Sequence, residues 1–226
     1  MAPTKVFVVG VGPGSLDYLT DVARKALEKS DIVAGFQASL KTVSHLLATK
    51  NVRVILFRHQ DDILKQIVEE SDGKVVAFTC TGNPNFSDSE YIQRICKFFG
   101  KVEIIPGVSS IQVAASKFGF PMDKSAVFTF HVTGEIKERK GELVNCVSAK
   151  KPVMLLPRPW DFMPKDVARF LIEEGIGEST ACGVCENLTL PNEKIFMGNL
   201  QELAAAEHFS DLSVMLLGES EFEVVR

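Results

Sequence analysis

The hydrophobic residues of this chain follow two patterns that alternate along most of its 226 residues. Short runs of β-branched and other apolar residues predict strands, and stretches with apolar residues three and four positions apart predict helices. Strands that alternate with helices are typical of a parallel sheet with crossover helices. The pattern therefore predicts an α/β fold.

The first half of the chain contains enough of these elements for a complete sheet. Strands are expected at 5–9, 32–35, 52–56, 75–79 and 103–106. Helices are expected from residue 20 onward and at 40–48, 62–70, 89–99 and 110–118. Thr20 is a side-chain N-cap candidate for the first helix, whose apolar face includes Ala23 and Leu27.

The pattern restarts after Gly119-Phe120-Pro121. Strands are then expected at 126–133, 152–156, 181–186 and 212–217, and helices at 141–149, 164–174 and 199–206. We therefore expect two α/β domains, residues 1–119 and residues 120–226, joined near residues 119–124.

Composition narrows the function classes. The net charge of -4 and the pI of about 5.7 give no overall field that attracts nucleic acid or an anionic membrane. No apolar run reaches the roughly 18 residues of a membrane span, and the N-terminus enters a strand without a signal peptide. Five scattered cysteines do not indicate a disulfide framework. We expect a cytoplasmic protein with reduced thiols that binds neither nucleic acid nor a membrane.

A glycine-rich loop, Gly10-Val11-Gly12-Pro13-Gly14, follows the first expected strand and brings bare backbone to the strand end. A dinucleotide-binding fingerprint needs a third glycine and an acid at the tip of the second strand. This chain has Ser15 at the position of the third glycine, and its second expected strand ends in Gly35 instead of an acid. A phosphate-binding Walker loop needs a Gly-Lys-Ser/Thr sequence that does not follow here. A tight turn without a ligand remains an alternative.

Two further loops of small residues follow strands of the same expected sheet. They are Cys80-Thr81-Gly82-Asn83-Pro84-Asn85-Phe86-Ser87-Asp88 and Pro106-Gly107-Val108-Ser109-Ser110. The carboxyl ends of parallel strands share one end of a sheet, which is where such folds bind ligands. Each loop alone is compatible with an ordinary turn, but the three together indicate a binding site.

These loops resemble the tetrapyrrole methylases, which use S-adenosylmethionine to methylate uroporphyrinogen and precorrins. The first loop is similar to the family's GxGPG, Thr81-Gly82-Asn83-Pro84 to its Gly-Asp-Pro loop, and the third loop to its PGxSS turn. Val184-Cys185-Glu186-Asn187-Leu188 and the residues after it resemble the branch that methylates C5 of precorrin-7 or cobalt-precorrin-7. The short chain is similar to the stand-alone form of that branch.

The resemblance implies an S-adenosylmethionine-dependent C-methyltransferase of cobalamin biosynthesis, acting as a homodimer. It implies two α/β domains with the cofactor in the cleft between them. The cofactor-binding residues that it implies are Pro13, Thr81, Gly82, Asn83, Phe86, Ser87, Ser109, Ser110, Leu156, Leu188 and Leu212. Gly12 and Gly14 are expected to border the macrocycle.

Two positions in the second loop depart from the family pattern. Asn83 stands where the family usually has an aspartate, and Asn85 where it has a glycine. Asparagine keeps a carbonyl that accepts hydrogen bonds but loses the charge. Asp88 is a neighbouring acid that offers a substitute for that charge.

Catalytic and substrate-binding residues are less clearly marked. His131 and Glu186, with Glu135, are the candidates if a proton is moved during the reaction, although a single histidine at a strand end also fits a structural role. The substrate carries many carboxylates, so Arg58 and Arg158 are expected to bind it. The basic run 137–140 is a weaker candidate, because charged runs are usually solvated helix faces.

We expect no metal site. Cys182 and Cys185 form a CxxC sequence, but no second pair supplies the remaining zinc ligands. Residues three apart in a strand point to opposite faces, so these thiols are expected to be buried and structural.

Two hypotheses remain open. The first is methylation of a corrinoid precursor, with another tetrapyrrole position as its variant. The second is a binding module that keeps the cofactor site without catalysis, for which Asn83 and Asn85 are the only support.

Overall fold

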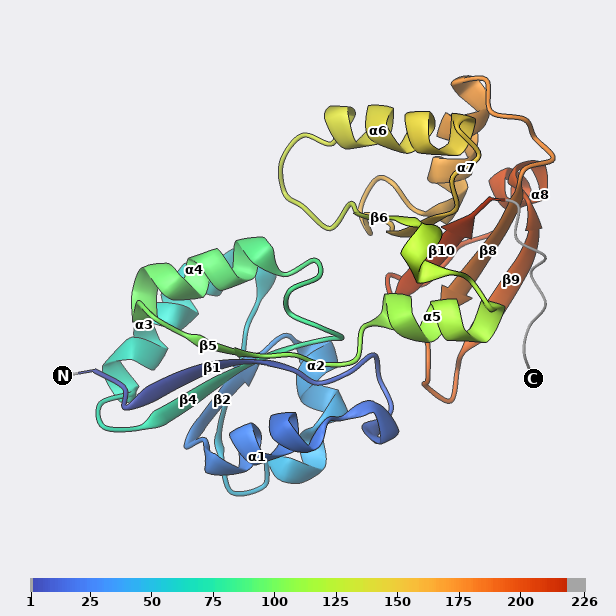
Figure 1. Ribbon diagram of the computed structural model, residues 1–226. Coiled ribbons are helices and arrows are strands. Elements are labelled where there is room, and N and C mark those ends of the chain that lie inside the picture. Colours follow the sequence, from blue (N-terminus) through green and yellow to red (C-terminus); the bar gives the residue numbers. More distant parts are fainter. Residues whose placement is uncertain (1, 219–226) are drawn as a thin grey trace. The chain divides into compact units, whose positions relative to one another are not determined.

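The computed structural model describes residues 2–218 of the chain (Figure 1). Two compact units divide it, the first reaching Ser109 and the second starting at Ser110. The division lies before the 110–118 helix, whereas the sequence pattern places it after residue 119. The helix belongs to the second unit because Phe118 packs on Gly183, where an added Cβ would lie 3.1 Å from the Phe118 ring.

The first unit contains a five-stranded parallel sheet in the order β3-β2-β4-β1-β5. The strands are β1 (Lys5–Gly10), β2 (Ile32–Gly35), β3 (Asn51–Val54), β4 (Val75–Cys80) and β5 (Glu103–Ile105). The α-helices are α1 (Asp21–Lys29), α2 (Gln37–Thr42), α3 (Gln60–Glu70) and α4 (Ser89–Phe99). Short 3-10 helices lie at Leu16–Tyr18, Ser44–Leu46 and Phe57–His59.

Helices cover both faces of this sheet, α3 and α4 on one face and α1 and α2 on the other (Figure 1). Alternate residues of β1 face the two layers: Val8 packs with α3 and α4, and Val9 with α1 and α2. Burial on both faces explains why β1, β2 and β4 are continuous apolar runs in the sequence. The Thr20 hydroxyl accepts a hydrogen bond from the Ala23 amide at 3.2 Å, which confirms the predicted cap of α1.

The second unit contains a five-stranded sheet in the order β6-β7-β10-β8-β9. Its strands are β6 (Ala126–Thr129), β7 (Val153–Leu156), β8 (Ala181–Glu186), β9 (Lys194–Asn199) and β10 (Ser213–Leu217). Its helices are α5 (Ser110–Phe118), α6 (Lys137–Ser148), α7 (Pro164–Glu173) and α8 (Leu200–Ala205), with a 3-10 turn at Met122–Lys124. Only β6 and β7 pair in parallel, so the expectation of a parallel sheet is wrong for this unit.

The core of the second unit lies between this sheet and the helices α6, α7 and α8. Leu143, Leu171 and Leu203 from the three helices are fully buried with Val184 and Met215 of the sheet. Residues of β8 alternate between this core and the face that α5 covers. Cys182 therefore faces the helical core, and Gly183 lies under Phe118.

Several predicted elements differ from the structure at their ends. Residues 40–48 are not one helix, because α2 ends at Thr42 and a 3-10 turn follows. The strand expected at 126–133 ends at Thr129, and α6 begins at Lys137, so the basic run forms its first turn. The strand β9 has no alternating apolar pattern because it is an edge strand with Ile195 and Met197 exposed.

Within residues 2–218, no helix is both long enough and apolar enough to span a membrane. Cys182 and Cys185 are buried with free thiols on β8, as the sequence predicts. Burial raises the pKa of each thiol to about 12, which keeps both protonated and unreactive at neutral pH.

The three small-residue loops of the first unit meet at the carboxyl end of its sheet. Beyond the strand ends, the Gly82 amide donates to the Gly12 carbonyl at 2.7 Å, and the Val11 amide donates to the Cys80 carbonyl at 2.9 Å. A Cβ added to Gly107 would lie 2.2 Å from the Gly82 carbonyl oxygen, and one added to Gly10 would lie 2.6 Å from the same atom. We call these backbone contacts the glycine junction.

The glycine junction predicts the effect of one methyl group. Gly107→Ala places that methyl against backbone atoms of Gly82 and Gly10, which cannot move as a side chain would. We expect the free energy of unfolding to fall by about 3 kcal/mol, measured by urea denaturation, because overpacking of a rigid site costs this much.

Gly141→Ala is the matched control. Gly141 lies within α6, and an added Cβ there has nothing within 4 Å. This change is expected to stabilise the protein by roughly 0.5–1 kcal/mol, because alanine favours helix more than glycine does. A Gly107→Ala protein as stable as the wild type would contradict the close backbone contact.

Candidate functional site

The first unit brings most of the expected cofactor-binding residues together. Pro13 lies in the loop after β1, which pairs with the loop after β4 through Gly12 and Gly82. Ser109 is buried in the loop after β5 and has a polar partner. Arg58 is exposed after β3, two strands from β4, and therefore does not lie with this group.

The loop after β4 is a compact turn that is held by its own side chain. The Asn83 side-chain oxygen accepts a hydrogen bond from the Asn85 amide at 3.1 Å, and the Phe86 amide donates to the Asn83 carbonyl at 2.9 Å. Ser87 has a φ of 90°, a conformation that favours glycine. An aspartate at position 83 would accept the same bond, so the Asn83 departure preserves the turn while removing one negative charge.

The last residue of this loop, Asp88, is a half-buried acid. The Cys80 thiol at the end of β4 donates a hydrogen bond to the Asp88 carboxylate, and Asp88 is the N-cap residue of α4. Burial raises the pKa of Asp88 to about 7, although the bond from Cys80 opposes this shift. The Tyr91 hydroxyl of α4 is buried and has no hydrogen-bond partner among the described residues.

The second unit also gathers its candidate residues at one end of its sheet. Thr129 pairs with Leu156 and Ser213 pairs with Glu186, so the carboxyl ends of β6, β7 and β8 lie beside the start of β10. The candidate residues at this end are His131, Leu156, Glu186, Leu188 and Leu212. Ser110 is the first residue of α5.

His131 lies in the loop after β6, two residues beyond the strand end. Its side chain hydrogen-bonds to the Pro157 backbone, while its Nε2 atom is buried and has no partner among the described residues. The bond to Pro157 therefore uses Nδ1 as the donor and leaves Nε2 as a bare acceptor. Burial lowers the pKa of His131, with the Asp211 carboxylate and the Pro157 bond opposing this, so the ring is neutral at pH 7.

Glu186 is held by the loop that precedes β10. Its carboxylate accepts a hydrogen bond from the Ser210 amide at 2.6 Å, and the Ser210 hydroxyl donates to the Asn187 side chain at 2.9 Å. Asn187 in turn donates its amide to the Leu212 carbonyl at 2.8 Å. These bonds fix the loops around Leu188 and give Glu186 a structural role in this unit.

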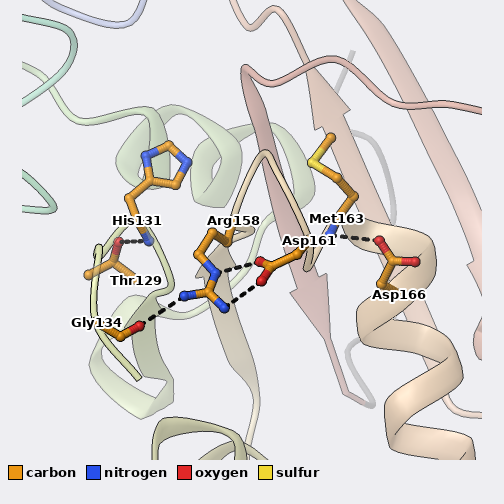
Figure 2. A network of polar contacts seen from close by, with 7 residues as sticks. All are labelled: Thr129, His131, Gly134, Arg158, Asp161, Met163 and Asp166. Carbon is orange, nitrogen blue, oxygen red and sulfur yellow. Dashed lines mark hydrogen bonds and ion pairs between the residues drawn. The ribbon is translucent and has the colours of Figure 1, made fainter. Parts of the chain in front are cut away.

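Arg158 follows β7 and is 8% exposed. Figure 2 shows its guanidinium between the Asp161 carboxylate, which it contacts through Nε and Nη2, and the Gly134 carbonyl, to which Nη1 donates at 3.0 Å. The guanidinium also lies 5.5 Å from the Trp160 ring. Arg158 therefore joins the loop before α6 to the loop after β7.

Sequence reasoning missed the partners that decide what these residues do. Asp161 lies three residues after Arg158, a spacing that is compatible with an ion pair but too common to predict one. Lys140 lies over the Phe162 ring at 4.1 Å, a contact that depends on pairing α6 with a distant loop. Of these partners, the sequence indicates only Asp88, as an acid near Asn83.

The raised pKa of Asp88 predicts how stability depends on pH. Because the folded-state pKa of about 7 exceeds the ordinary value of 3.8, the folded state holds the proton more tightly. The free energy of unfolding is therefore greatest below about pH 4 for this group and falls as pH rises to about 7. We expect Asp88→Asn to remove this fall and to stabilise the protein at pH 8 by on the order of 2 kcal/mol.

Urea denaturation between pH 4 and pH 8 measures this difference. Asp72→Asn, which changes an exposed carboxylate in the same unit, is the control and is expected to leave the pH dependence as in the wild type. If the free energy of unfolding of the Asp88→Asn protein depends on pH as in the wild type, ionisation of Asp88 does not destabilise the folded state.

Comparisons with known proteins agree with this arrangement. A family model described as Tetrapyrrole (Corrin/Porphyrin) Methylases matches residues 5–204. A probable cobalt-precorrin-7 C(5)-methyltransferase of Methanocaldococcus jannaschii is 33% identical over 214 residues, which are 92% of this chain and 95% of the relative. A cobalt-precorrin-4 C(11)-methyltransferase of the same organism is 26% identical over 227 residues, which are 95% of this chain and 87% of the relative.

A solved structure shares the fold. The uroporphyrin-III C-methyltransferase of Thermus thermophilus, in complex with S-adenosyl homocysteine, superposes with a TM-score of 0.74 and 18% identity, covering 95% of this chain and 97% of the other. The predicted α/β fold is confirmed. Methyl transfer from S-adenosylmethionine is the activity of the matched family, which confirms the predicted enzyme class and cofactor. With its family model matched over most of its length, this chain belongs to the tetrapyrrole (corrin/porphyrin) methylases.

Proposed function

We propose that this protein transfers a methyl group from S-adenosylmethionine to C5 of precorrin-7 or cobalt-precorrin-7 in cobalamin biosynthesis. The observation that carries this proposal is the relationship, over nearly the full length of both chains, to the probable C(5)-methyltransferase. The residues from Val184 to Leu188, which resemble the C5-methylating branch, support it. They form the end of β8 and the loop after it, at the same end of the sheet as His131.

The glycine junction suits the cofactor that the family uses. Gly10, Gly82 and Gly107 keep three loops in backbone contact, so peptide groups rather than side chains form the surface beside them. We assign the cofactor contacts of the first unit to Pro13, Thr81, Gly82, Asn83, Phe86, Ser87 and Ser109. Those of the second unit are assigned to Ser110, Leu156, Leu188 and Leu212.

The chemistry places modest demands on the protein. When bound, S-adenosylmethionine supplies the methyl group of its sulfonium centre. The rest of the cofactor then departs as a neutral thioether. A meso carbon of a reduced macrocycle is enamine-like and needs no base to attack. The loops therefore act mainly by holding two ligands in line and excluding water, an effect worth about 7–11 kcal/mol in favourable cases.

We assign the proton acceptor to His131. After the new carbon–carbon bond forms, the methylated carbon loses its hydrogen as a proton, and a neutral imidazole with a bare Nε2 can accept it. The bond from Nδ1 to the Pro157 backbone fixes that tautomer. Glu186 stays a weaker candidate, since its carboxylate already accepts the Ser210 amide.

The other expectations are part of the same proposal. Gly12 and Gly14 are assigned to the border of the macrocycle, and Arg158 to the binding of its carboxylates through the loops that it holds. The homodimer and the cytoplasmic location stay predictions. Substrate binding by Arg58 also stays a prediction. Its side chain is exposed after β3, which lies two strands from β4 in the sheet.

Methyl transfer to a defined carbon tests the proposed function. The full-length protein is incubated with S-adenosylmethionine carrying a ¹³C-labelled methyl group and with precorrin-7 or cobalt-precorrin-7. We expect mass spectrometry to show the gain of one methyl group and ¹³C NMR to place it at C5. Cofactor binding by calorimetry without transfer to any precorrin would support the binding-module hypothesis instead, and transfer only to precorrin-4 at C11 would overturn the assigned position.

A His131→Gln variant separates the chemical step from binding. We expect kcat to fall by about 10²-fold while calorimetry shows unchanged affinity for S-adenosylmethionine, because general-base catalysis contributes factors of this size. His208→Gln is the matched control, since His208 is exposed in the same unit. Equal kcat values for both variants would remove His131 from the mechanism.

A further inference from the structure

A pocket of about 630 Å³ lies within the second unit at the start of α6. Thr133 and Glu135 from the preceding loop line it, together with Lys137 and Lys140 of the helix and Arg158 from the loop after β7. Three of these five side chains are basic. The pocket is formed by one unit alone, so its lining is fixed by the packing of α6 against its own sheet.

The two lysines provide positive charge that the protein does not neutralise. In the described part of the chain, neither Lys137 nor Lys140 forms an ion pair with a carboxylate. The Lys140 ammonium lies 4.1 Å from the Phe162 ring centre and 4.9 Å from that of Phe170. These rings orient the ammonium while leaving its N–H groups to donate elsewhere.

Arg158 makes part of the pocket lining rigid. Its side chain is held by the Asp161 carboxylate and the Gly134 carbonyl, as Figure 2 shows, so it cannot swing away from the pocket. The residue is 8% exposed, and this burial strengthens the charge-assisted bonds that hold it. Gly134 also lines the pocket, which means that the same bonds fix the loop before α6.

The net charge of the pocket favours a monoanion. Three cations, Lys137, Lys140 and Arg158, line the pocket with one carboxylate, Glu135, and Asp161 pairs with Arg158, so the difference is a single positive charge. The N-cap residue of α6, Ile136, has no side-chain acceptor for the amides of the first turn. A carboxylate matches this charge and accepts from both ammonium and amide donors, whereas a phosphate dianion would meet Glu135 with an excess of negative charge.

We propose that this pocket binds one peripheral carboxylate of the tetrapyrrole substrate, with Lys137 and Lys140 as its direct partners and Arg158 as the residue that positions the loop. This inference rests on the proposed function, because it takes a carboxylate-bearing macrocycle as the substrate. It assigns to the basic run 137–140 a role in binding, where the sequence alone favours a solvated helix face.

Binding of a stable octacarboxylate porphyrin, uroporphyrin, tests the proposal without turnover. The full-length protein is titrated with uroporphyrin in the presence of S-adenosyl homocysteine, and porphyrin fluorescence gives Kd. We expect Lys137→Gln with Lys140→Met to raise Kd by about tenfold or more, since each lost charge-assisted bond weakens binding by roughly this factor. Methionine at position 140 keeps apolar contact with the Phe162 and Phe170 rings.

Lys151→Gln is the matched control, because it removes one exposed positive charge just beyond the other end of α6. We expect its Kd to equal that of the wild type, and calorimetry to show the same affinity for S-adenosyl homocysteine in all three proteins. Equal Kd values for the double variant and the wild type, or no uroporphyrin binding by the wild type, would overturn the proposal. The same holds if inorganic phosphate or succinate occupies the pocket at micromolar concentration and uroporphyrin does not displace it.

The methyl-transfer assay distinguishes this failure from failure of the proposed function. If wild-type protein methylates precorrin-7 and the double variant has the same KM, the pocket assignment is wrong while the activity stands. If no precorrin is methylated but the double variant still loses uroporphyrin affinity, the pocket assignment stands and the assigned reaction is wrong.

Discussion

The backbone contact among Gly10, Gly82 and Gly107 is the constraint on which the first unit depends. Its strands β4, β1 and β5 are neighbours in the sheet, so the loops that follow them leave the same end and must share a small space. A Cβ at Gly107 or Gly10 would fall within 2.6 Å of the Gly82 carbonyl oxygen, and only glycine allows the loops to close on one another. The glycine-rich loop after β1 is therefore a packing requirement first, and the proposed ligand surface is its consequence.

The chemistry of the two units is different in kind. The first unit presents peptide groups and small side chains and keeps one carboxyl, Asp88, with a pKa raised to about 7 behind them. The second unit contains Lys137 and Lys140 beside a pocket, and His131, whose buried Nε2 atom has no partner among the described residues. In the proposed function, the first unit supplies most of the cofactor contacts, and the second supplies the remaining ones together with the basic pocket and His131.

The sequence predicts the first unit better than the second. The inner strands β1, β2 and β4 are apolar runs because both faces are buried, and the Thr20 cap is visible in the residues themselves. The edge strand β9 is exposed on Ile195 and Met197 and leaves no periodic signal. The sequence likewise does not show which unit α5 belongs to, because this depends on the packing of Phe118 on Gly183, some sixty residues later.

The candidate site divides along the same line. Loop residues such as Thr81 and Ser109 could be predicted from motif order, since parallel strands bring their ends together. The partners of His131, Arg158 and Asp88 could not, because each is a contact between segments whose pairing only the fold decides.

Amide hydrogen exchange with and without S-adenosyl homocysteine tests the central claim most directly, namely that the glycine junction is the cofactor surface of this methylase. The account predicts slower exchange, on binding, in residues 10–14, 80–88 and 106–110 of the full-length protein. Protection that is absent from all three segments, while calorimetry shows the compound bound, would contradict it.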